Sequence, residues 1–167
     1  VTVTELQAML AVVDGCKWPR LGKVKPSKVW ETFLTGHYAY GFRSQDWIAA
    51  RSSEKKGLLW SGVITASQCP VLDDLHNEPG WVWYLVHKTA HKDEAAERPS
   101  DVLAPLSWKM RELLEEFRGI DDERVFPMAN NSRTYSEEFR KLLERAGLSD
   151  ESRRKEGKPI IRLSLGQ

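Results

Sequence analysis

Cysteine is scarce in this chain, with only Cys16 and Cys69 among 167 residues. The two stand far apart and outside any Cys-x-x-Cys or Cys/His pattern, so we expect reduced thiols rather than a structural disulfide. Thiols stay reduced in reducing compartments, and a cytoplasmic location is therefore expected.

Long hydrophobic runs are missing as well. No apolar run approaches the roughly 20 residues that a bilayer-spanning helix needs, and no charged-then-apolar leader opens the chain. We expect a soluble protein without a membrane partner. With 41% hydrophobic residues, positions 1–167 are enough for a single domain with its own core. The chain stops at Gln167 directly after an apolar run, which suggests a domain truncated at its C-terminus.

An excess of charge of either sign is also absent. The chain has 25 Lys and Arg against 24 Asp and Glu, a formal net charge of +1. The composition therefore gives no overall basic signature of a nucleic-acid-binding protein, and any DNA-binding surface must be local.

Common signatures of catalysis are missing too, since the chain has no Gly-rich phosphate loop and no Ser/His/Asp motif. His87 and His91 have the spacing of two metal ligands on a helix. The residues around them predict a hairpin, however, where that spacing does not align two imidazoles. We expect no metal and no cofactor, and a conventional hydrolase is not favoured.

The N-terminal part predicts helices. Residues 1–15 have helical spacing of apolar residues, with a capping box at Thr2 and Glu5 and a stop at Gly15. Pro26 opens a second helix over 27–34, with Trp30, Phe33 and Leu34 on one face. Gly36 is expected to break this helix, which restarts over 38–51 with Phe42 and Trp47 as buried residues.

The middle of the chain predicts a small sheet. Residues 57–65, 81–89 and 101–106 are short, rich in Val, Ile, Trp and Tyr, and separated by turn-like or charged segments. Helical spacing returns over 107–119 and 136–147, with Ser107 and Ser136 as N-caps and Gly119 and Gly147 as stops. The expected class is α+β, mostly helical with a small three-stranded antiparallel sheet.

The predicted hairpin between the second and third strands places Lys88 and Lys92 at its tip. A lysine on a mobile hairpin can reach a phosphodiester without a rigid pocket. A solvated charged turn is the alternative interpretation of the same residues.

The opening helix and three further segments, in this order, resemble the catalytic domain of tyrosine recombinases, the phage-integrase-like DNA strand-exchange enzymes. The family has an opening helix, and then a Thr-Gly that introduces an Arg-bearing helix ending in Trp; here "LTGHYAYGFRSQDW" has Thr35, Gly36 and Trp47 at that spacing. "HKTAHKDEAAERPSDVLAPL" is similar to the family's Lys-bearing hairpin, with Lys88 and Thr89 at the matching positions. "RVFPMANNSRTYSEEFRKLLERAGL" is similar to its Phe-Pro segment and the helix that follows.

The resemblance implies site-specific DNA recombination or integration by a phage or mobile-element protein, with double-stranded DNA as partner and self-association on DNA. In this chemistry a Tyr hydroxyl attacks a DNA phosphate, two Arg hold the transition state, and a Lys protonates the departing 5′ oxygen. Lys88 is the one catalytic candidate that the resemblance supplies.

The chain departs from the family at the reacting groups. Tyr38 stands where the family has its first Arg, and a neutral phenol cannot replace the fixed charge and five donors of a guanidinium. Arg43, five residues on, lies about 140° around a helix and would not substitute without a register change. The family's His-x-x-Arg element either falls on Ser164 and Gln167 or lies beyond the end. All four tyrosines precede that point, so this chain alone should not cleave DNA.

Tyr135 is expected either to pack in the core or to contact a phosphate. The candidate DNA-contacting residues form one list: Arg43, His87, Lys88, Lys92, Arg133 and, as a second patch, Arg153, Arg154, Lys155 and Lys158. A solvated linker before a last strand is the alternative for the second patch. The alternative function is a non-catalytic DNA-binding or protein-interaction module, in which Trp81 and Trp83 on one strand face serve either the core or a partner surface.

Overall fold

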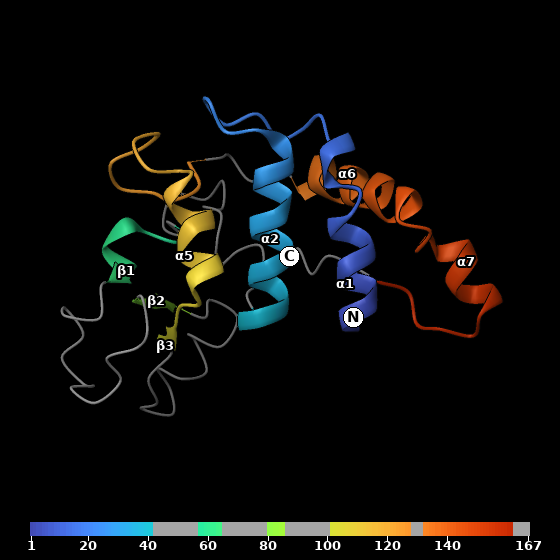
Figure 1. The fold of residues 1–167 in the computed structure, drawn as a ribbon. Helices are drawn as coiled ribbons and strands as arrows, with labels where there is room; N and C mark the ends of the chain where they lie inside the picture. The colour runs from blue at the N-terminus through green and yellow to red at the C-terminus, as the bar shows by residue number, and fades with distance from the viewer. Residues whose placement is uncertain (42–56, 65–79, 86–100, 128–131, 162–167) are drawn as a thin grey trace. The chain divides into compact units, whose positions relative to one another are not determined.

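The computed structural model describes residues 1–41, 57–64, 80–85, 101–127 and 132–161 (Figure 1). Their contacts divide the chain into two compact units. Unit 1 contains the described residues 1–41 and 132–161, and unit 2 contains 57–64, 80–85 and 101–127. The prediction of a single domain over 1–167 stays a prediction. None of the helices in these ranges is long and apolar enough to cross a membrane.

The first helix, α1, spans Val3–Leu10 and begins at the predicted capping box. The Glu5 amide donates to Thr2 Oγ1 at 3.2 Å, and the Thr2 amide donates to Glu5 Oε2 at 2.8 Å. Each bond satisfies a backbone amide that the first turn would leave unpaired. The helix ends earlier than predicted, because Val13–Gly15 forms a separate 3₁₀ turn, η1.

Helix α2 spans Pro26–Tyr40 and begins at Pro26 as predicted. The predicted break at Gly36 is wrong, since α2 continues through this residue and ends at Gly41, whose φ is +65°. A mid-helix glycine costs only about 1 kcal/mol relative to alanine. Burial of Trp30 and Phe33 on the same helix outweighs that cost. The predicted restart over 38–51, with Phe42 and Trp47, lies outside the described residues from position 42 onward.

Helix α6 spans Ser132–Arg145 and packs with α1 and α2. Ser136 lies inside α6, so its predicted role as an N-cap is wrong. Tyr135, one residue before it, is 1% exposed. Its burial stabilises an additional helical turn at the N-terminal end of α6. Gly147 ends the segment as predicted, with φ at +71°. A short helix that the sequence did not predict, α7, follows over Asp150–Lys155.

Aromatic side chains from α2 and α6 form the core of unit 1. Trp30 stacks on Phe139 with ring centroids 6.1 Å apart, and Phe33 meets Tyr135 edge-on at 5.8 Å. Tyr135 was predicted either to pack in the core or to contact a phosphate, and in the structure it packs in the core. Burial also raises the pKa of its phenol above the usual range.

Unit 2 contains the predicted three-stranded antiparallel sheet, in the order β1 (Val63–Ile64), β2 (Trp81–Leu85) and β3 (Asp101–Pro105). Val63 lies opposite Val82, and Trp83 lies opposite Leu103. The first strand is shorter than predicted, because Trp60–Gly62 forms a 3₁₀ turn, η2. The α+β class is confirmed at this level.

Helix α5 spans Trp108–Glu115, and Ser107 is its N-cap as predicted, accepting from the Met110 amide at 3.1 Å. Its apolar face supplies the core of unit 2, where Phe117 and Phe126 meet edge-on with centroids 4.6 Å apart. Trp81 is 5% exposed, so it belongs to this core and not to a partner surface. The side chain of Trp83 lies outside the described part.

Candidate nucleic-acid interface

A basic segment connects η1 to α2 in unit 1. Residues 17–28, which we call the basic loop, carry five basic residues, and no carboxylate occurs between Asp14 and Glu31. The five are Lys17, Arg20, Lys23, Lys25 and Lys28. In a chain whose net charge is +1, this is a strong local concentration of positive charge.

The basic loop is held firmly by its apolar residues. The indole Nε1 of Trp30 donates to the Trp18 carbonyl at 2.7 Å, and the Trp18 ring meets Tyr135 edge-on at 4.5 Å. Leu21 and Val24 are 6% and 5% exposed and pair with each other across a tight turn. These contacts anchor the backbone of the basic loop to the core of unit 1. The backbone that carries the cations is therefore preorganised for binding.

The polar side chains of the basic loop point the other way. Lys17, Arg20, Lys23 and Lys25 are exposed. Lys28, at the start of α2, is paired with Glu31 at 2.8 Å. Within the described ranges, the four exposed cations of the basic loop form no ion pair. Their charge is thus available to a partner.

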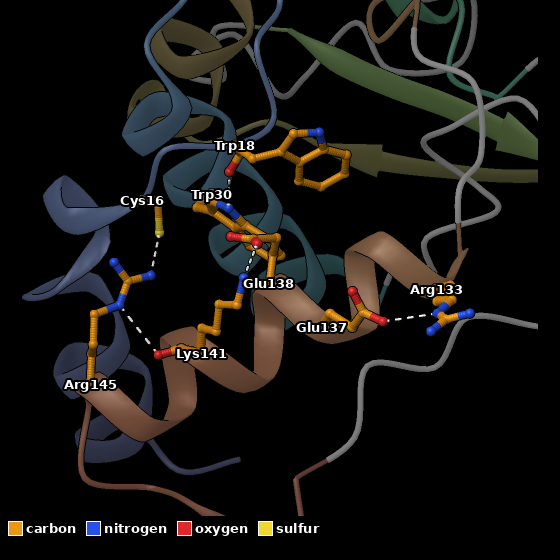
Figure 2. A network of polar contacts seen from close by, with 8 residues as sticks. All are labelled: Cys16, Trp18, Trp30, Arg133, Glu137, Glu138, Lys141 and Arg145. Carbon is orange, nitrogen blue, oxygen red and sulfur yellow. Dashed lines mark hydrogen bonds and ion pairs between the residues drawn. The ribbon is translucent and has the colours of Figure 1, made fainter.

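A pocket of about 650 Å³ opens beside the basic loop, lined by Gly15, Lys17, Trp18, Glu138, Lys141, Glu144 and Arg145. Figure 2 shows the polar contacts of three of these residues, Glu138, Lys141 and Arg145. Lys141 is paired with Glu138 at 2.7 Å. Arg145 donates from Nη2 to Cys16 Sγ at 3.2 Å and from Nε to the Lys141 carbonyl at 3.3 Å. The wall of the pocket thus combines one neutralised pair with two further cations, Lys17 and Arg145, and one further carboxylate, Glu144.

Cys16 lies buried behind Arg145 with a free thiol. Burial raises the pKa of this thiol, and the nearby Arg145 guanidinium opposes part of that rise. Cys16 is therefore a neutral thiol at pH 7. Cys69 lies outside the described residues.

Most of the hairpin and integrase-like candidates cannot be placed. Arg43, His87, Lys88 and Lys92 lie outside the described residues. Thr35 and Gly36 lie inside α2 instead of introducing a new helix, which corrects the predicted position of this motif. Tyr38 is 44% exposed on the last turns of α2.

Arg133 is exposed at the start of α6, where its Nε bonds Glu137 at 2.9 Å. The end of α6 at Arg145 lies twelve positions further along the chain, about 18 Å along the helix. Since α7 follows that far end, Arg133 does not form one patch with the basic residues of α7 (Figure 1).

The second predicted patch is a helix and not a linker. Arg153 is buried, bonding Glu5 from one guanidinium nitrogen and the Pro159 carbonyl from another. A phosphate could reach Arg153 only by breaking this ion pair, so the burial of Arg153 does not favour its predicted role in DNA contact, which stays a prediction. Arg154 and Lys155 are exposed, with Lys155 paired to Glu151 at 2.7 Å. Lys158, beyond the helix, is paired to Glu156.

The sequence contains a charge pattern that predicts the basic loop, but the net charge of the whole chain does not reveal it. A run of five cations without a carboxylate is a local charge pattern, and a sliding count of charge would have found it. In the ranges that the structure describes, no group of three or more His, Cys, Asp or Glu side chains could hold a metal ion.

Comparisons of the chain with protein-family models, with curated proteins and with solved structures find no match.

Proposed function

We propose that this chain binds double-stranded DNA through the basic loop. The observation that carries the proposal is the group of four exposed cations, Lys17, Arg20, Lys23 and Lys25, on a backbone anchored to the core. Lys and Arg side chains supply most contacts to the DNA backbone, and such contacts position a protein without reading sequence. Because the loop is already ordered, binding costs less conformational entropy than on a flexible tail.

We further propose that the DNA-binding chain belongs to a tyrosine-recombinase-like protein of a phage or mobile element. Its support is the order of the opening helix and the three similar segments, together with a small antiparallel sheet that comes between helices in the order of the chain. In this proposal Lys88 is the catalytic lysine, and self-association takes place on DNA. The chain alone does not cleave DNA, since Tyr38 replaces an arginine. Reduced thiols favour the cytoplasm as its location.

Fluorescence anisotropy with a labelled duplex at several salt concentrations tests the DNA-binding proposal. Each neutralised phosphate contributes about −0.9 to the slope of log K against log salt, so four contacts predict a slope of about −3.6. Replacing Arg20, Lys23 and Lys25 by alanine should weaken binding and bring the slope to about −0.9.

A charge-matched control removes three exposed cations that have carboxylate partners, namely Arg133, Lys155 and Lys158. This variant should retain the affinity and the slope of the unchanged chain. If the control loses affinity and the loop variant does not, DNA contact lies with the earlier candidates and not with the basic loop.

An exposed tryptophan favours a protein-interaction module as the second candidate. Trp108, in the first turn of α5, is 68% exposed, and Leu103 on β3 is 38% exposed. Tryptophan is costly to expose and is enriched at protein interfaces. Absence of DNA binding even at low salt would move this candidate ahead.

A further inference from the structure

The tip of the Arg145 side chain lies close to the backbone of Gly15. A Cβ atom on Gly15 would lie 2.7 Å from the Arg145 Nη1 atom, so only glycine lets the guanidinium take this position without a shift. Nη2 bonds the Cys16 sulfur, and Nε bonds the Lys141 carbonyl. Neither acceptor is an anion, and among the described residues Arg145 has no carboxylate partner. The guanidinium of Arg145 therefore lines the pocket without an ion-pair partner among the described residues.

The bond to Cys16 is easily exchanged. Sulfur is a weak acceptor, and the raised pKa of the Cys16 thiol keeps it uncharged. An oxyanion attracts a guanidinium by its charge as well as by hydrogen bonding, and it can accept two parallel N–H groups at once. An anion that enters the pocket thus offers Arg145 a better partner than the one it has.

The remaining charges of the pocket favour an anion of modest charge. Lys141 and Glu138 neutralise each other. Lys17 and Arg145 then stand against a single carboxylate, Glu144, and all three line the pocket. The pocket volume of about 650 Å³ leaves ample room for a phosphate group with its ester substituent.

We propose that this pocket binds a phosphate group, with Arg145 as its hydrogen-bonding clamp and Lys17 as its second cation. Lys17 belongs both to the pocket and to the basic loop, so a backbone phosphate of bound DNA is one source of the group. A free phosphate or phosphomonoester is the other source. The proposal extends the proposed DNA binding but is tested separately, because a soluble phosphate needs no duplex.

The first experiment follows by NMR the backbone amide signals of the residues that line the pocket, and in the unchanged chain also the Arg145 Nε–H signal. Inorganic phosphate is added first, and then a 5′-phosphorylated nucleotide or a short duplex. Arg145→Gln should weaken binding about tenfold or more, the effect of losing a hydrogen bond to a charged group. Gly15→Ala keeps the net charge but makes the tip of the guanidinium shift, so it should weaken binding by less than Arg145→Gln. Glu144→Gln should strengthen it. Arg140→Gln, an exposed cation of α6 that does not line this pocket, is the matched control and should change nothing.

The three ligands distinguish a soluble phosphate from a phosphate of the DNA backbone. Binding of inorganic phosphate or nucleotide that depends on Arg145 supports a site for soluble phosphates. Dependence on Arg145 with the duplex alone supports a backbone phosphate. The alanine variant at Arg20, Lys23 and Lys25 should still bind inorganic phosphate, so failure of the loop proposal leaves the pocket testable. If no ligand moves the Arg145 signal, or if Arg140→Gln weakens binding as much as Arg145→Gln, the proposal is overturned.

Discussion

Arg153 of α7 and Glu5 of α1 form a buried ion pair between residues 148 positions apart in the chain. Their side chains are 6% and 12% exposed. Glu5 also accepts from the Thr2 amide, and Arg153 also donates to the Pro159 carbonyl, so both charged groups have several partners. This pair ties the C-terminal helix of unit 1 to its N-terminal helix.

Breaking this pair should destabilise unit 1. Glu5→Gln leaves a guanidinium buried without its counter-charge, which typically costs about 3–5 kcal/mol. Urea denaturation measures the loss in free energy of unfolding. Glu151→Gln breaks the exposed pair with Lys155 instead and should change stability by no more than about 0.5 kcal/mol. Equal effects of the two substitutions would contradict the structural role of the buried pair.

The same pair predicts how stability depends on pH. The hydrogen bond from Arg153, followed by that from the Thr2 amide, lowers the pKa of Glu5 from 4.5 to about 2. A group whose pKa is lowered on folding stabilises fully above its unfolded pKa, and its contribution is lost as pH falls through the folded pKa. Stability should therefore decline between pH 4.5 and about 2. Glu5→Gln should show a shallower decline over this window, and parallel curves would show that Glu5 does not titrate in this way.

Because Trp30 anchors the basic loop, a substitution at this buried residue should weaken DNA binding even though Trp30 does not contact DNA. Trp30→Phe removes the indole donor to the Trp18 carbonyl and leaves that carbonyl without it, at a cost of about 1–3 kcal/mol. DNA affinity, measured by anisotropy, should fall because the cations lose their fixed backbone. Trp60→Phe is the matched control, since it removes an equivalent indole bond to the Asp121 carbonyl in unit 2. It should lower stability by a similar amount while DNA affinity is kept.

The resemblance to tyrosine recombinases predicts that Lys88→Ala leaves stability unchanged but weakens binding to duplex DNA. The physical reason is the loss of one charged contact to a phosphate. Anisotropy titration measures this, with thermal unfolding as the check on stability. Equal affinity of the variant and the unchanged chain would remove Lys88 from the DNA-contacting residues.

Local signals in the sequence predicted local structure well. The capping box at Thr2 and Glu5, the start of α2 at Pro26 and the N-cap at Ser107 depend on residues within one turn, and all three are confirmed. The predicted helix break at Gly36 and the predicted N-cap at Ser136 were wrong. Burial of neighbouring aromatic residues stabilises helix at both positions.

Residues whose role depends on distant partners could not be predicted. Arg153 appears in the sequence as part of an exposed basic run, and nothing near it reveals that Glu5 is its partner. Arg145 likewise needs Gly15 and Cys16, which come from the opposite end of the chain. The basic loop was hidden for another reason, since its five cations are balanced by carboxylates elsewhere in the chain.

Unit 1 is assembled from two separate stretches of sequence, while the described parts of unit 2 lie in the interval between them. During synthesis, α2 therefore leaves the ribosome long before Tyr135 and Phe139 exist to cover Trp30 and Phe33. Such distant contacts pay a large loop-closure cost before they contribute, and they slow folding. Unit 2 can complete its own contacts before α6 is synthesised. Until α6 covers it, the aromatic face of α2 is exposed and prone to aggregation.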